Sequence, residues 1–114
     1  MHTHHAIDYI ELSVRDILAA KRFYAEAFGW EFTDYGPAYA GIRGTDHEMG
    51  GLQQVAEVAT GGPLVVLYSQ DLPSTFAAVQ SAGGTIVKEP FAFPGGHRFH
   101  FRDPSGNELA VWGV

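Results

Sequence analysis

Hydrophobic and polar residues alternate near the start of the chain, over the segment Ile7–Val14. Every second position is apolar: Ile10, Leu12 and Val14. The positions between them are Tyr9, Glu11 and Ser13. A period of two predicts a strand with one buried face. Helical spacing follows, between Asp16, whose carboxylate can cap the first turn, and Gly29, a residue suited to ending a helix.

The same succession returns in the second half of the chain. Leu64–Ser69 is an apolar run of strand type, Asp71 is a second capping residue, and Gly83–Gly84 ends a second helix. Asp71 follows Asp16 by 55 residues, and Gly84 follows Gly29 by the same 55. Two landmarks that share one offset indicate a duplication.

Three short strands are expected after each helix, over residues 30–35, 39–43 and 50–58, and then 85–91, 97–102 and 108–112. Asp103-Pro104-Ser105-Gly106, between the last two, fits a type I turn. The pattern predicts an α+β protein with two βαβββ modules, at about 6–59 and about 63–114. The hinge Thr60–Gly61–Gly62–Pro63 is too short for an independent-domain linker, so one domain over 1–114 is expected.

Composition excludes several classes of function. The 114 residues carry a net charge of −6, and the seven Lys and Arg residues form no basic stripe, so we expect no nucleic-acid partner and no binding to a membrane surface. No apolar run approaches the roughly 18 residues of a membrane span. The absence of cysteine and of a signal peptide pattern favours a cytoplasmic protein. We expect His2, His4 and His5 to form a frayed tract that holds no metal.

These elements resemble those of the vicinal oxygen chelate superfamily, which includes glyoxalase I, bleomycin-resistance proteins and extradiol dioxygenases. The resemblance covers nearly the whole chain and is carried by residues 7–16, by Phe23-Tyr24 and Phe28-Gly29-Trp30, and by residues 99–109 with their Asp-Pro-Ser-Gly-Asn turn. It is strongest for small bacterial proteins related to lactoylglutathione lyase. The resemblance implies a curved mixed sheet around a cavity, helices on the outer face, a small-molecule ligand and a homodimer.

The resemblance also implies a divalent metal held by His and Glu on the first and fourth strands of each module, and here the chain departs from the pattern. Tyr9 and Leu64 occupy the His positions, Ala110 occupies one Glu position, and the other falls near Gln53. Leu and Ala offer no donor atom. We therefore expect no metal and no other cofactor.

Strand alternation predicts which side chains face the cavity. If Ile10 and Leu12 face the helix, Glu11 must face the other way. The same argument places these further candidates for ligand binding on the cavity side: Tyr9, Ser13, Tyr68, Arg98 and Trp112. Glu11 is the candidate base, because a carboxylate that loses hydration holds a proton more readily. The alternative is a structural ion pair of Glu11 with Arg98 or Arg43.

His100 is the second candidate catalytic residue, as proton donor or ligand anchor. Its alternative role is a hydrogen bond within the sheet. Arg98 suits a ligand carboxylate, or else neutralises Glu108. Residues such as Tyr9, Tyr68 and Trp112 more often form cavity wall or core than take part in chemistry.

Two functions remain open at this point. The first is a glyoxalase-like enzyme of lyase or isomerase type, in which Glu11 moves a proton next to a carbonyl and His100 or Tyr9 supports the oxyanion. The alternative is a binding protein of the bleomycin-resistance type, which sequesters a small molecule without chemistry. A structural subunit explains the polar residues on the inner face least well.

Overall fold

The computed structural model describes residues 2–58 and 62–114. Thr60 and Gly61 of the expected hinge therefore lie outside the described residues. The chain divides into two compact units, one of residues 9–63 and one of residues 2–8 together with 64–114. Each unit is described separately.

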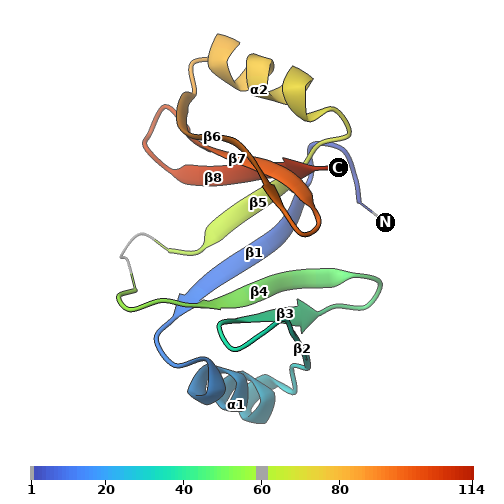
Figure 1. The fold of residues 1–114 in the computed structure, drawn as a ribbon, viewed down its shortest axis with the longest axis vertical. Helices are drawn as coiled ribbons and strands as arrows, with labels where there is room; N and C mark the ends of the chain where they lie inside the picture. The colour runs from blue at the N-terminus through green and yellow to red at the C-terminus, as the bar shows by residue number, and fades with distance from the viewer. Residues whose placement is uncertain (1, 59–61) are drawn as a thin grey trace. The chain divides into compact units, whose positions relative to one another are not determined.

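The first unit contains one helix and a four-stranded sheet (Figure 1). Its elements are β1 (Ile7–Val14), whose first two residues belong to the second unit, α1 (Ile17–Phe28), β2 (Phe32–Asp34), β3 (Tyr39–Arg43) and β4 (Glu48–Gln54). The strand order is β2-β3-β4-β1, with β1 parallel to β4 and the other pairs antiparallel.

The second unit repeats this plan. Its elements are β5 (Leu64–Tyr68), α2 (Leu72–Ser81), β6 (Thr85–Phe93), β7 (Gly96–Arg102) and β8 (Glu108–Gly113). The strand order is β5-β8-β7-β6, again with one parallel pair, β5 and β8. Both units are βαβββ modules with mixed sheets, which confirms the predicted α+β class.

Both helices begin at the predicted caps. The Asp16 carboxylate accepts a hydrogen bond from the Ala19 amide at 3.2 Å, and that of Asp71 accepts from Ser74 at 3.3 Å. These bonds satisfy amides that have no partner within the first turn. Helix α1 ends at Gly29, whose φ of 74° is left-handed, as glycine allows. The offset of 55 residues therefore marks matching helix starts.

In each unit the helix covers one face of the sheet (Figure 1). Ile17 of α1 packs on Ala40, Ile42 and Leu52, with Leu12 and Val14 against this core. In the second unit, Leu72 and Phe76 of α2 pack with Phe99, Val111 and Leu67. The opposite side of each sheet is called here its helix-free face.

The N-terminal segment packs on the second unit. Backbone hydrogen bonds join the His5 amide to the Tyr68 carbonyl and the Tyr68 amide to the Ala6 carbonyl. The His5 ring lies 3.0 Å from the Thr75 hydroxyl, and His4 accepts a hydrogen bond from the Gln70 amide. The expectation of a frayed tract was wrong, because these residues extend strand pairing along β5.

Candidate functional site

Glu11 lies on the helix-free face of the first unit. Strand β1 aligns Glu11 with Gly51 and Ser13 with Gln53 of β4, while Leu12 on the other side joins the core under α1. Only 7% of Glu11 is exposed. A buried carboxylate requires hydrogen-bond donors, so its partners define the site.

Two tyrosines form a hydrogen-bonded chain to this carboxylate. The Tyr39 hydroxyl donates to Glu11 Oε2 at 2.9 Å, and the Tyr9 and Tyr39 hydroxyls are 2.7 Å apart. Because the single proton of Tyr39 goes to Glu11, Tyr9 must donate to Tyr39. Two predicted residues, Tyr9 and Glu11, are thus joined through a third that sequence reasoning missed. The chain Tyr9–Tyr39–Glu11 is called here the tyrosine–glutamate chain.

Glycines on β3 and β4 make room for these groups. A Cβ atom at Gly51 would collide with the hydroxyls of Tyr39 and Tyr9, and one at Gly41 would collide with the Glu48 carboxylate. Gly41 and Gly51 are aligned partners in the sheet. Glycine inside a strand signals close approach of another group, so this pair is the sequence signal that could have drawn attention to Tyr39.

Burial keeps both phenols protonated. It raises the pKa of Tyr9 to about 12, and the negative charges of Glu48 and Glu11 act in the same direction. Burial raises the pKa of Tyr39 further, assisted by the negative charge of Glu11 and by the hydrogen bond that Tyr39 donates to it. Both hydroxyls are therefore donors at neutral pH.

The second unit presents its predicted residues on the helix-free face as well. His100 aligns with Ala110, and Trp112 aligns with both Arg98 and Tyr68. The Tyr68 and Trp112 rings contact each other at 5.0 Å. The Trp112 indole also donates to the Asp8 carboxylate at 3.0 Å. This bond holds the Trp112 indole in one orientation.

His100 is 4% exposed and its Nδ1 lies 3.0 Å from Oε2 of Glu108. The structural alternative for His100, a hydrogen bond within the sheet, is therefore present. Burial lowers the pKa of His100, and the positive charges of Arg98 and Lys88 lower it further, against the opposing effect of Glu108. The imidazole is neutral at neutral pH.

Arg98 lies among aromatic rings. Its guanidinium carbon is 5.7 Å from the Phe91 ring centre and 6.0 Å from that of Phe93. Phe91 also stacks on His100 at 5.8 Å. Phe91 and Phe93 were not singled out from sequence, because the register of β6 shifts on both sides of Lys88 and simple alternation fails there.

The strand register identifies the four positions at which the family would hold a metal. In the second unit, Ala110 on β8 aligns with Val66 on β5, which lies two residues after the expected His position, Leu64. In the first unit, the residue in the same relation to Tyr9 is Gly51 on β4, because Gly51 aligns with Glu11. The fourth position is therefore Gly51 and not Gln53. Three of the four residues have no donor atom, and the Tyr9 phenol is protonated and hydrogen-bonded. These residues do not fit the family's metal.

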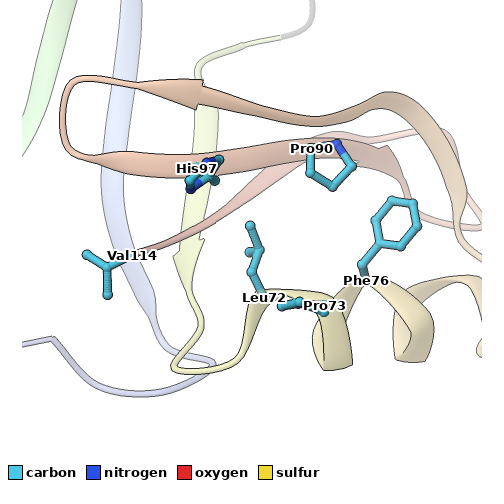
Figure 2. A pocket seen from close by; sticks show the side chains of 6 residues that line it. All are labelled: Leu72, Pro73, Phe76, Pro90, His97 and Val114. Carbon is cyan, nitrogen blue, oxygen red and sulfur yellow. The ribbon is translucent and has the colours of Figure 1, made fainter.

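A separate pocket of about 370 Å³ lies on the helix side of the second unit (Figure 2). It is lined by Leu72, Pro73 and Phe76 at α2, by Pro90 and His97 of the sheet, and by Val114. None of the predicted site residues belongs to it. Within residues 2–58 and 62–114, neither helix is long and apolar enough to cross a membrane.

The sequence profile of the Glyoxalase/Bleomycin resistance protein/Dioxygenase superfamily matches residues 6–111, and the chain belongs to this superfamily. A search of curated proteins found no match.

Solved structures share the fold. The Mn(II)-bound glyoxalase from Novosphingobium aromaticivorans is 25% identical to this chain, with a TM-score of 0.73. The match covers 99% of this chain and 40% of that one, so the present chain spans less than half of that protein. A methylmalonyl-CoA epimerase variant from Streptomyces coelicolor, in complex with 2-nitronate-propionyl-CoA, has a TM-score of 0.80 at 16% identity, covering 98% and 96% of the two chains. A superfamily member from Vibrio splendidus matches at 0.73 with 16% identity, covering 96% and 99%.

Proposed function

We propose that this protein binds a small carbonyl compound on the helix-free face of its first unit and transfers a proton next to the carbonyl, without the metal of the family. The observation that carries the proposal is the buried Glu11 carboxylate, held by a hydrogen bond from Tyr39. A general base needs a lone pair in a fixed position. The tyrosine–glutamate chain supplies that position.

Glu11 accepts the proton from the carbon next to the carbonyl in this proposal. The negative charge then moves to the carbonyl oxygen, where a protonated phenol is a suitable donor. In the resting chain the Tyr39 proton is donated to Glu11 and the Tyr9 proton to Tyr39, so in this proposal protonation of Glu11 releases the Tyr39 hydroxyl to donate to that oxygen. Delivery of a proton to the opposite face of this carbon gives an isomer, whereas departure of a leaving group from the enolate gives a lyase product, so the proposed reaction is of isomerase or lyase type.

The remaining candidates are proposed to bind ligand on the unit to which each belongs. Ser13 shares the face of Glu11, whereas Arg98, Tyr68 and Trp112 offer a separate cationic and aromatic surface on the second unit. Solved relatives named as glyoxalase and methylmalonyl-CoA epimerase support an enzyme over a structural role. We further propose a cytoplasmic homodimer without nucleic-acid or membrane partners.

Deuterium exchange into a panel of simple carbonyl compounds tests the proposal. Small aldehydes, ketones, 2-oxo acids and thioesters are incubated with the protein in D2O, and proton NMR follows loss of the signal next to each carbonyl. We expect catalysed exchange for at least one compound and its loss in Glu11→Gln. Glu26→Gln, a change at an exposed glutamate on α1, is the matched control.

A non-catalytic binding protein is the second candidate function. The aromatic surface around Arg98, formed by Phe91, Phe93 and Trp112, favours it, because such a surface suits flat organic molecules. Tight binding of a compound without exchange in any member of the panel would support this function over the enzyme.

A further inference from the structure

His2 of the N-terminal segment lies against two aromatic rings and a carboxylate of the second unit. Its imidazole stacks on the Tyr68 ring with 5.1 Å between ring centres, and its edge-to-face contact with the Trp112 ring measures 5.0 Å. Nδ1 of His2 is 2.7 Å from Oδ1 of Asp8. A carboxylate oxygen only accepts hydrogen bonds, so the imidazole is the donor. These are the contacts that a bound heterocycle would make.

The groups that contact His2 are held in place by one another. The other carboxylate oxygen of Asp8 accepts a hydrogen bond from the Trp112 indole at 3.0 Å, and the Asp8 side chain is only 5% exposed. The Tyr68 and Trp112 rings contact each other at 5.0 Å, and Phe93 packs on Trp112 at 6.1 Å. A surface that keeps its shape without its occupant needs little reordering to bind another.

A strained turn directs His2 onto this surface. The Ala6 amide donates to the Thr3 carbonyl at 3.1 Å, which closes the turn. His5 lies inside the turn with a φ of 64°, a left-handed conformation that costs energy in a residue with a Cβ atom. Such strain persists only where the surrounding contacts impose it, and it is common at ligand clamps and switch regions. Residues 2–6 are called here the N-terminal strap.

Two side-chain contacts help to fasten the N-terminal strap, and water can replace both. The His5 ring lies 3.0 Å from the Thr75 hydroxyl. His4 Nδ1 accepts a hydrogen bond from the Gln70 amide at 2.9 Å. Both histidines are exposed. Segments held by exposed hydrogen bonds open at a low cost in free energy, so His2 is a displaceable occupant.

We propose that Asp8, Tyr68 and Trp112 form a binding site for an imidazole-type heterocycle, a planar ring that carries an N–H group, and that His2 occupies this site until such a ligand displaces it. The inference rests on the proposed function in treating the Tyr68 and Trp112 surface of the second unit as ligand-binding. It does not require Glu11 to be a base.

The contacts of His2 set the size and the chemistry of the ligand. The acceptor oxygen of Asp8 and the ring of Tyr68 are spaced for one imidazole, because His2 meets both at once. A fused imidazole keeps the N–H bond and adds a second ring that extends the aromatic contact. Benzimidazole is therefore the probe. Benzothiazole, in which sulfur replaces the N–H group, is its matched control.

Proton NMR of the unsubstituted protein detects displacement directly. While the strap is closed, the rings of Tyr68 and Trp112 shift the His2 ring signals away from the values of an exposed histidine. Addition of benzimidazole should return these signals toward those values. The signals of His97, an exposed histidine on β7, should stay unchanged.

Calorimetric titration of His2→Ala measures the competition. A ligand binds with an affinity reduced by the fraction of protein in which its site is open. A tethered group has an effective concentration of about millimolar, so we expect His2→Ala to bind benzimidazole roughly tenfold more tightly than the unsubstituted protein does. His97→Ala is the matched control and should bind like the unsubstituted protein. His2→Ala should also prefer benzimidazole to benzothiazole roughly tenfold, because only benzimidazole donates to Asp8.

Three results would overturn the inference: no binding of benzimidazole to His2→Ala, equal affinity of His2→Ala and the unsubstituted protein, or equal affinity of His2→Ala for the two heterocycles. Failure of the proposed function is recognised separately. Glu11→Gln should lose deuterium exchange and keep its affinity for benzimidazole, and a lack of exchange across the carbonyl panel would leave the benzimidazole result unaffected.

Discussion

At the scale of single residues, Glu11 shows how far alternation can lead. A period of two along β1 predicted that Glu11 faces away from the helix, and the core around Leu12 and Val14 places it there. The Tyr39 contact was beyond reach, since β3 is separated from β1 by β4. Finding it needs the register of two strand pairs, which one sequence does not provide.

Tyr39→Phe is expected to lower the free energy of unfolding by about 1–3 kcal/mol, because it leaves the buried Glu11 carboxylate without this donor. Urea unfolding gives the value. Tyr35→Phe is the matched control: Tyr35 also donates to a glutamate, Glu48, but is 57% exposed. Its loss should be smaller, and equal losses would argue against a special role of burial at Glu11.

His100 should make stability depend on pH. Burial, Arg98 and Lys88 lower its pKa below the ordinary value of about 6.5, against Glu108. Below about pH 6.5, therefore, His100 is protonated more often in the unfolded chain than in the folded protein. The free energy of unfolding contributed by His100 is complete above about pH 6.5 and falls as the pH drops toward the lowered pKa.

Urea unfolding of the unsubstituted protein and of His100→Gln across this pH range isolates the effect from the other histidines. The substituted protein should show a weaker rise of stability with pH. Equal slopes for the two proteins would contradict a lowered pKa of His100.

At the scale of elements, the starts of helices were predictable and the bounds of strands less so. Asp16 and Asp71 cap the helices as expected, since capping depends on only a few neighbouring residues. Strand β4 was expected at 50–58 and spans Glu48–Gln54. Its start is set by pairing of Glu48 with Arg43, a contact with another strand that local pattern does not encode.

Asp71→Ala is expected to cost about 1 kcal/mol of stability, because the Ser74 amide loses its acceptor. Thermal or urea unfolding measures the loss. Asp71→Asn preserves an acceptor oxygen and should stay close to the unsubstituted protein. If Asn were as destabilising as Ala, the negative charge and not the cap would be the stabilising feature.

At the scale of the whole molecule, the duplicated βαβββ plan was predictable because two landmarks repeat at one offset. The four positions at which the family holds its metal were only partly predictable from the sequence. Three followed from the sequence, whereas the fourth needed the alignment of β1 with β4 that places Gly51 opposite Glu11. Because these positions do not fit the metal, the proposed proton transfer rests on this chain's own Glu11 and its tyrosines.

The rate of deuterium incorporation next to a substrate carbonyl, compared between Glu11→Gln and Glu26→Gln, tests this assignment most directly. Removal of a general base typically costs about 10²–10⁴-fold in rate. The account predicts a loss of that size for Glu11→Gln and none for Glu26→Gln. Equal exchange rates for the two variants would contradict it.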